Sequence, residues 1–390
     1  MHQLDEYIST GGKLLRCGYT TGTCAAAATR AAAELLLGGV EVPSVVMSVP
    51  AGIDVLVEVE EAERGNTWAR CAVRKDAGDD PDVTDGVLVV ARVSLAENPG
   101  VTILGGEGVG RVTRPGLDQP VGAAAINAVP RTMITQEAQE ASRAHGYQGG
   151  LVVEISIPEG VVLAQRTFNP RLGIEGGISV LGTSGIVRPM SEEALVSSLK
   201  LELRVKRATG VNDVLVVPGN YGHDFAVQSL GLSDDRMVSC SNYVGAVLDE
   251  AVLLGFRTLL LVGHVGKLVK VAGGIMNTHS RVADCRMEIL AAHAALAGAT
   301  AQDIALIMGA ATTDAALDVL DEHGLLTSAL QTMVDRLGAV LSHRAGESLQ
   351  VEAVMFSNKR GTLGMTAGAE TLMELHRHGL RLDEGAGETR

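Results

Sequence analysis

The sequence predicts a mixed fold, with an α+β first half and a second half built as an α/β domain around a parallel sheet. Residues 258–262 form a short apolar run without alternation, which is typical of a strand buried on both faces of a parallel sheet. After residue 190 strand-like and helix-like stretches alternate, as they do in parallel-sheet domains. Before residue 190 strand-like stretches dominate. We therefore expect two domains, residues 1–190 and residues 191–390.

Composition narrows the class of protein. A chain of 390 residues that is 46% hydrophobic can bury the cores of two domains. A net charge of −14 argues against nucleic acid as the main partner. The chain has neither an apolar run of membrane-spanning length nor the features of a signal peptide at its start, so we expect no membrane partner. Five cysteines without a CxxC pattern fit a reducing cytoplasm, and the sequence leaves open whether copies form a homo-oligomer.

The first half begins with an alanine-rich helix. Residues 25–33 are strong helix formers, Thr21 or Thr23 is the expected N-cap, and Gly38-Gly39 should end the helix. The threonine- and glycine-rich start is typical of an anion site at a helix N-terminus, and a purely structural cap is an equal alternative. The further elements expected here are strands at 44–49, 54–60, 67–75, 87–95, 101–104 and 151–157, and helices at 121–128 and 132–144 divided by Pro130.

Three irregular segments of the first half need interpretation. Residues 76–85 are acidic but lack the spacing of an EF-hand, so we expect a solvated loop. Residues 105–110 are rich in glycine but precede an extended stretch, which indicates a hairpin or flap and not a dinucleotide-binding loop. Residues 169–190 hold many glycines, which indicates that the backbone lies close to another group.

The second half supplies the predicted parallel sheet. We expect strands at 213–217, 237–240, 258–262 and 349–356, and helices starting at Ser191 and at 242–254, 282–297, 303–308, 313–323 and 328–341. The tail after Leu382 is polar and expected to fray.

Polar, glycine-bearing loops follow three of these strands, at residues 219–224, 263–267 and 357–361. Because the carboxyl ends of parallel strands meet at one edge of a sheet, these loops predict a ligand crevice. His264 and His279 are the candidate catalytic residues. A histidine metal pair is less favoured, since no carboxylate or cysteine pattern supports coordination, and we predict no protein-bound metal. The candidate residues for binding the cofactor are Gly219, Asn220, Gly222, His223, Gly263 and Gly266.

Six stretches together resemble the cobalt-precorrin-5B C1-methyltransferase family (CbiD). They lie in the same order as in the family and extend over nearly the whole chain. They are GYTTGTCAAAA at 18–28, NPRLGI at 169–174, GTSGIV at 182–187, GHD at 222–224, GHVGKL at 263–268 and HSRVAD at 279–284.

The resemblance implies an activity and a fold. The family methylates carbon 1 of cobalt-precorrin-5B, giving cobalt-precorrin-6A, in the anaerobic route to cobalamin, with S-adenosylmethionine as methyl donor. Its N-terminal α+β domain is described as a permuted relative of the second domain of ribosomal protein S5, and a parallel-sheet α/β domain follows. Residues 191–390 are then the expected donor-binding domain.

A tetrapyrrole substrate with many carboxylates needs local positive charge on this acidic protein. The candidate substrate-binding residues are Thr21, Thr23, Arg171, Arg188, Lys267, Arg281 and Lys359. Two other functions stay open at this point. A phosphotransferase would bind ATP and magnesium, and a non-enzymatic tetrapyrrole carrier would bind a corrinoid without a methyl donor.

Overall fold

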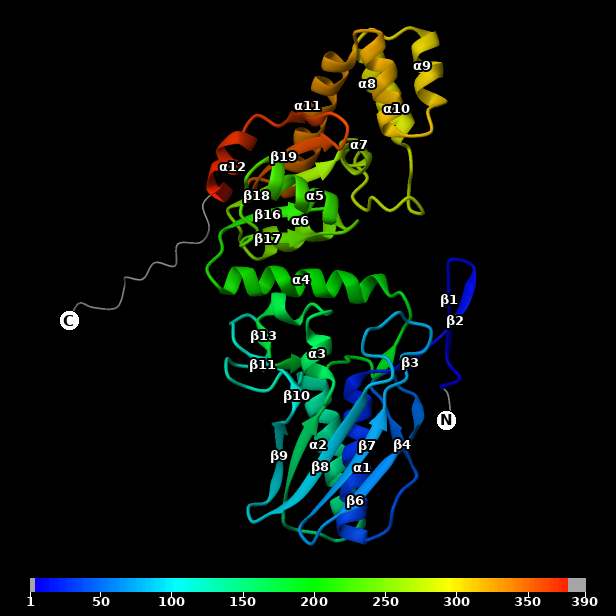
Figure 1. Ribbon diagram of the computed structural model, residues 1–390, viewed down its shortest axis with the longest axis vertical. Coiled ribbons are helices and arrows are strands. Elements are labelled where there is room, and N and C mark those ends of the chain that lie inside the picture. The colour runs from blue at the N-terminus through cyan, green and yellow to red at the C-terminus, as the bar shows by residue number, and fades with distance from the viewer. Residues whose placement is uncertain (1–3, 378–390) are drawn as a thin grey trace, which may run out of the picture. The chain divides into compact units, whose positions relative to one another are not determined.

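The computed structural model describes residues 4–377, so the tail after Leu382 lies outside the described residues. The chain forms two compact units, Met1–Leu195 and Val196–Arg390 (Figure 1). The division falls in the first turn of helix α4 (Glu192–Ala208), where the sequence predicts a boundary at residue 190. Among the described residues, no helix combines the length and the apolar character that crossing a membrane requires.

The first unit is a five-stranded sheet against which two helices pack (Figure 1). In spatial order its strands are β6 (Glu61–Arg64), β7 (Trp68–Arg74), β8 (Leu88–Ala96), β12 (Gly150–Ser156) and β9 (Gly100–Gly105). Helix α1 (Thr21–Gly38) packs against β7, β8 and helix α2 (Ala128–Ala144). The alanines of α1 are fully buried, and their small side chains let its backbone approach both neighbours closely.

Short strands and a small α-helix, together with a 3-10 helix at 169–172, complete the described part of this unit. They are the hairpin β1 (Tyr7–Thr10) and β2 (Lys13–Arg16), β3 (Gly18–Tyr19), β4 (Ser44–Ser48), β5 (Asp54–Glu58), β10 (Gly108–Val109), β11 (Arg111–Val112), β13 (Ile174–Glu175), β14 (Gly177–Ile178), β15 (Ile186–Val187) and α3 (Gly160–Ala164). Strand β10 pairs in parallel with β14, so the expected hairpin at residues 105–110 is wrong. Gly108 has a positive φ, and a Cβ there would stand 1.7 Å from the carbonyl oxygen of Ile157, so this crossing requires glycine.

Helix α2 differs from the two helices expected around Pro130. The stretch 121–127 is irregular, and a single helix starts at Ala128 and contains Pro130 in its first turn. Proline lacks only its N–H, and the N–H groups of a first helical turn have no partner within the helix. Pro130 therefore starts this helix and does not divide it.

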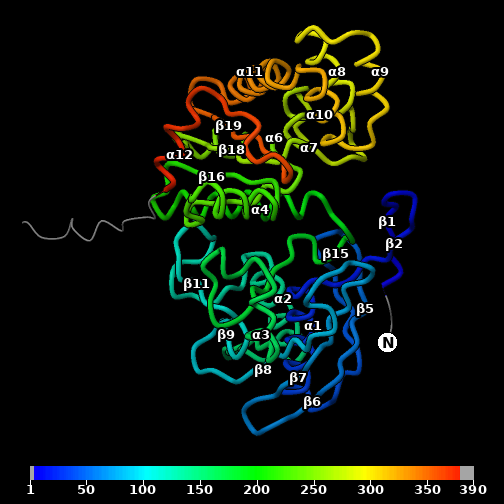
Figure 2. The backbone as a smooth tube through the Cα atoms, turned by 45° about the horizontal axis from the view of Figure 1, so that its top comes forward, coloured from blue at the N-terminus to red at the C-terminus, as the bar shows by residue number. Residues whose placement is uncertain are grey.

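The second unit is also a five-stranded sheet. In spatial order its strands are β17 (Met237–Ser239), β16 (Asp213–Val217), β18 (Thr258–His264), β19 (Gln350–Ser357) and β20 (Gly361–Met365). The first four run parallel, as predicted, and β20 runs antiparallel to β19. Strand β20 was not predicted from the sequence. Strands β16, β18 and β19 lie side by side in that order (Figure 2).

The strand order creates a switch point between β16 and β18. The chain leaves β16 toward β17 on one side and then crosses back to β18 on the other. The connection after β16 contributes Phe225 and Ala226 to the core that contains Leu215, whereas helix α6 (Val244–Leu253) contributes Val247 to the core that contains Val214. Open α/β sheets bind ligands at the carboxyl ends of the strands at such a point.

The remaining segments of the second unit pack on the sheet or on helices beside it. They are α5 (Asn220–Asp224), the π-helix η2 (Phe225–Ser229), α7 (Val265–Ala272), α8 (Arg286–Leu296), α9 (Ala301–Met308), α10 (Thr313–Glu322), α11 (Leu326–Ala345) and α12 (Ala369–Arg377). The helix expected at 282–297 starts only at Arg286, because the polar residues before it form a loop.

The buried His376 of α12 should make stability depend on pH. Its side chain is 1% exposed, and neither ring nitrogen has a hydrogen-bond partner in the described part of the chain. Burial lowers the pKa of His376 to about 4. Between pH 7 and pH 5 the unfolded chain takes up a proton that the folded chain refuses, so this residue should lower the free energy of unfolding by about 2 kcal/mol.

Urea unfolding at pH 7 and pH 5 tests this prediction. The stability lost on acidification should be smaller in His376→Leu than in the parent protein. His343→Leu, which alters an exposed histidine of α11, should keep the parental pH dependence. Identical pH dependence of His376→Leu and the parent would contradict the assignment.

Candidate functional site

The loops after three parallel strands meet at the switch point of the second unit. Val217 of β16 aligns with Ser239 of β17, and Val216 aligns with Leu261 of β18, so the loops after these strands leave the same edge. The first of them begins with Pro218-Gly219, where Gly219 has φ 105° and ψ −171°. Only glycine adopts this conformation readily, so the path of the loop depends on Gly219.

Lys267 joins two of these loops. It lies in the first turn of α7, and its Nζ donates to the carbonyl oxygen of Pro218 at 2.9 Å and to that of Ser241 at 3.1 Å. Burial lowers the pKa of Lys267. Since an ammonium has three N–H donors, these bonds leave one for a ligand. The predicted contact of Lys267 with substrate stays a prediction, and the structure gives this residue a second role as a tie between loops.

His264 caps helix α7 at the end of β18. Its Nδ1 accepts a hydrogen bond from the Gly266 N–H at 3.1 Å, so a neutral His264 ring carries its proton on Nε2. Burial lowers the pKa of His264, which favours that neutral form. The ring meets Phe356 edge-on at 5.5 Å. His264 is therefore arranged to donate a hydrogen bond from Nε2 and not to act as a base.

His279 and Arg281 belong to an exposed loop that hydrogen bonds to Asn242 and Lys270 hold in place. The Thr278 N–H donates to the carbonyl oxygen of Asn242 at 2.9 Å, beside the loop after β17. The buried Lys270 donates from Nζ to the carbonyl oxygens of Thr278 at 3.1 Å and Ala283 at 2.9 Å. The Arg281 N–H donates to His279 Nδ1 at 3.1 Å, which repeats the arrangement at His264. Both side chains are exposed.

The third loop expected at the crevice, residues 357–361, is a tight turn into β20. The hydroxyl of Ser357 accepts the Arg360 N–H at 3.0 Å. Lys359 pairs with both carboxylate oxygens of Asp318, at 2.7 and 2.8 Å. The substrate-binding role of Lys359 stays a prediction, although its ammonium already has a carboxylate partner. The loop after β17, which Lys267 ties to the loop after β16, was not predicted as part of the site, because no glycine directly follows that strand.

The other predicted cofactor-binding residues differ in their surroundings. Gly222 is buried against β18, and a Cβ there would lie 2.9 Å from the carbonyl oxygen of Val262. A Cβ on Gly263 would meet the side chain of Leu268, which is part of the core, so Gly263 serves packing. Asn220 is exposed, and His223 Nδ1 lies 3.0 Å from a carboxylate oxygen of Asp224.

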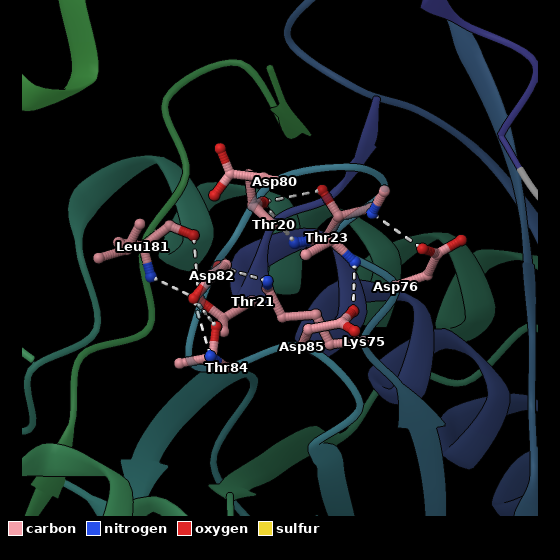
Figure 3. A network of polar contacts seen from close by, with 12 residues as sticks. Thr20, Thr21, Thr23, Lys75, Asp76, Asp80, Asp82, Thr84, Asp85 and Leu181 are labelled. Carbon is pink, nitrogen blue, oxygen red and sulfur yellow. Dashed lines mark hydrogen bonds and ion pairs between the residues drawn. The ribbon is translucent and has the colours of Figure 1, made fainter. Parts of the chain in front are cut away.

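In the first unit, the threonines that start α1 hold two distant stretches of chain together (Figure 3). Thr20, and not Thr21 or Thr23 as predicted, is the N-cap, and its hydroxyl accepts the Thr23 N–H at 3.2 Å. The Thr23 hydroxyl donates to the carbonyl oxygen of Gly185 at 2.6 Å. The Thr21 hydroxyl donates to the carbonyl oxygen of Leu181 at 3.2 Å and accepts the Leu181 N–H at 3.0 Å. Substrate binding by Thr21 and Thr23 stays a prediction.

The acidic loop beside these threonines is not the solvated loop that was expected (Figure 3). Asp76 forms a two-pronged pair with Arg16, both contacts at 2.7 Å. Asp82 pairs at 2.6 Å with Lys75, whose side chain is only 2% exposed, and Asp85 accepts the Ala77 N–H at 2.8 Å. Its carboxylates therefore serve internal contacts, which spacing along the sequence does not reveal.

The two predicted arginines of the first unit are exposed. Arg171 lies in the short 3-10 helix η1 (Asn169–Leu172), with its guanidinium 5.6 Å from the centre of the Phe168 ring. Arg188 follows β15. Across residues 4–377, no three His, Cys, Asp or Glu side chains gather as a metal site would require. The absence of a protein-bound metal stays a prediction.

Comparison with known proteins gives a consistent result along the chain. The family model described as CbiD matches residues 8–189, and that described as CbiD, C-terminal domain, matches residues 277–367. A protein of Ruminiclostridium cellulolyticum named cobalt-precorrin-5B C(1)-methyltransferase is 48% identical over 91% of this chain and 92% of its own length. A protein of the same name from Alkaliphilus metalliredigens is 43% identical over 95% of this chain and 98% of its own length.

Among solved structures, the chain is similar to the cobalamin biosynthesis protein CbiD of Archaeoglobus fulgidus. The two sequences are 32% identical, and the match covers 72% of this chain and 87% of that chain with a TM-score of 0.39.

Proposed function

This chain belongs to the CbiD family, and from that premise we propose that it transfers a methyl group from S-adenosylmethionine to carbon 1 of cobalt-precorrin-5B. The observation that carries the proposal is the identity of 48% with a relative of that name over nearly the full length of both chains. The product is then cobalt-precorrin-6A, and the reaction belongs to the anaerobic route to cobalamin. Five free cysteines support the further proposal that the protein works in a reducing cytoplasm.

The reaction requires alignment more than acid–base chemistry. An electron-rich ring carbon attacks the sulfonium methyl group, a carbon–carbon bond forms as the carbon–sulfur bond breaks, and the bonding pair returns to sulfur. Most of the protein's contribution is to hold the two molecules in line and exclude water. A neutral His264 with its proton on Nε2 suits this task, because it can orient a ligand without competing for the methyl group.

We propose that the donor binds at the switch point of the second unit. Three features support this placement. The Gly219 loop takes a path that only glycine allows, Lys267 holds the Pro218 and Ser241 carbonyls in place, and His264 presents Nε2. We also propose that the first unit is a permuted relative of the ribosomal S5 second domain. Its five-stranded sheet with α1 and α2 supports that relationship.

Exposed arginines are proposed to hold the carboxylates of the tetrapyrrole. Changing Arg281 or Arg171 to glutamine should raise the tetrapyrrole KM by about tenfold to a hundredfold, since a charge-assisted hydrogen bond contributes roughly 1.5–3 kcal/mol. Donor affinity should stay nearly unchanged. The effect should shrink as salt rises, because screening already weakens the pairing in the parent protein.

The measurement is a pair of titrations, one for each ligand, at two salt concentrations. Arg336→Gln, which alters an exposed arginine of α11, is the matched control for Arg281→Gln and should change neither titration. If Arg281→Gln loses both ligands equally, the residue supports the fold or the donor site and the assignment fails.

The proposed activity itself is tested by an anaerobic assay with isotopically labelled donor and mass spectrometry of the tetrapyrrole product. We expect one labelled methyl group at carbon 1. Calorimetry separates the alternatives, because a phosphotransferase would bind ATP with magnesium and a carrier would bind the corrinoid but not the donor. A product without label would reject the proposed function.

A further inference from the structure

Helix α10 presents three carboxylates toward the end of the second sheet. Asp314, Asp318 and Asp321 follow one another at helical spacing, so they lie along one side of the helix. Two of them have cationic partners in the turn after β19. Asp318 pairs with Lys359 and, at 2.6 Å, with Arg360, and Asp321 pairs with Arg360 at 2.7 Å. Asp314 is one helical turn closer to the start of the helix.

Asp314 differs from the other two in that one of its carboxylate oxygens has no partner. Its Oδ1 is buried and makes no hydrogen bond to any described residue. A buried polar atom without a partner is unfavourable and rare, because it has lost its water without gaining another bond. Such an atom marks a place where a ligand or a bound water completes the structure.

The position of Asp314 places this unpaired oxygen at the carboxyl end of β18. The charge of Asp314 acts on His264 and raises its pKa against the larger lowering effect of burial. The neighbouring Thr313 hydroxyl would lie 3.7 Å from a Cβ on Gly266, in the first turn of α7. The start of α10 therefore borders the same strand end as His264, within the proposed donor site.

We propose that Asp314 binds the α-ammonium group of the methyl donor, an inference that rests on the proposed function. The unpaired Oδ1 requires a ligand atom that carries a hydrogen. The sulfonium sulfur of the donor carries no hydrogen. The ammonium group of the donor has N–H donors and also a positive charge. Ribose hydroxyls would satisfy the hydrogen bond but leave the carboxylate charge unbalanced. Lys359 and Arg360 are already paired with Asp318 and Asp321.

Three adenosyl ligands and one substitution test the proposal. S-adenosylmethionine and S-adenosylhomocysteine both carry the ammonium, and methylthioadenosine keeps the ribose and adenine but lacks it. Calorimetry on the full chain should show that Asp314→Asn binds S-adenosylmethionine and S-adenosylhomocysteine about 10- to 100-fold more weakly than the parent protein does. The affinity for methylthioadenosine should change by less than about twofold.

The matched control is Asp321→Asn, the same substitution on the same side of α10, which should leave all three affinities unchanged. Without ligand, Asp314→Asn should be about as stable as the parent, since Oδ1 has no hydrogen bond to lose. A loss shared equally by all three ligands would overturn the proposal in favour of the ribose or of general damage to the site. Unchanged binding of all three would overturn it as well.

The failure of this inference can be told from failure of the proposed function. If the parent protein binds none of the three adenosyl ligands, the donor assignment is wrong and the role of Asp314 falls with it. If the parent binds them and Asp314→Asn binds them equally well, only the inference about Asp314 is wrong.

Discussion

Replacing Asp82 with alanine should lower the free energy of unfolding of the first unit by about 3–5 kcal/mol, the cost of leaving a buried charge unpaired. Lys75 is 2% exposed at its side chain, and its Nζ lies 2.6 Å from Asp82 Oδ2. Burial acts to raise the pKa of Asp82, but the charge of Lys75 and the hydrogen bonds from Lys75 and Thr84 outweigh it and keep that pKa below its usual value. Without Asp82, the buried Lys75 ammonium would lose the carboxylate that pairs with it at 2.6 Å.

A double-mutant cycle in urea checks this prediction. Asp82→Ala combined with Lys75→Met should recover much of the lost stability, because a methionine of similar length needs no partner. If the double variant is as unstable as Asp82→Ala alone, the loss comes from the hydrogen bonds of Asp82 to the Thr84 N–H and hydroxyl, at 2.8 and 2.7 Å. The unpaired-charge explanation would then be wrong.

Replacing Lys267 with methionine should weaken donor binding by at least about a hundredfold, or roughly 2.7 kcal/mol. Methionine keeps the apolar stem but gives up both hydrogen bonds to the Pro218 and Ser241 carbonyls. Each such bond to a charged donor contributes roughly 1.5–3 kcal/mol. The two loops should then move apart, and part of the donor's binding energy would be needed to bring them back.

Titration with S-adenosylmethionine measures this effect, and thermal unfolding establishes that the variant is folded. Lys200→Met is the control, since it alters a lysine that is partly exposed on α4 and pairs with Glu250. If Lys267→Met binds the donor with normal affinity, the hydrogen bonds of Lys267 between the two loops do not contribute to the proposed donor site. A loss confined to the tetrapyrrole would instead favour the direct substrate contact that the sequence predicts for Lys267.

The fold was predictable wherever the local sequence pattern is compatible with only one kind of secondary structure. Residues 213–217 form a fully buried strand, and the apolar run 214–217 within it has the length of a strand and not of a helix. Helix α1 ends at Gly38, and Gly39 takes the left-handed conformation with φ 76° that favours glycine. In the second unit, the alternation of strands and helices led to the parallel sheet and to the loops that carry Gly219 and His264.

The candidate site was predictable only in part, because side-chain partners depend on contacts distant in sequence. Lys267 was assigned to the substrate from its position in a polar loop, yet its ammonium contacts the carbonyls of Pro218 and Ser241, which other strands bring to it. Asp314 was not among the site residues predicted from the sequence. Its only signal was the spacing with Asp318 and Asp321, and that spacing acquires meaning once Lys359 and Arg360 are seen to pair with just those two.

The sequence by itself therefore determined the family, the elements with strong periodicity and the strand ends at which polar loops gather. Tertiary structure alone decided the strand order β17-β16-β18-β19, the internal roles of Lys75, Lys267 and Lys270, and the unpaired Oδ1 of Asp314. The physical reason is the range of the interactions. Backbone preference and hydrophobic period act over a few residues, whereas a buried charge is stabilised by whichever groups the fold places around it.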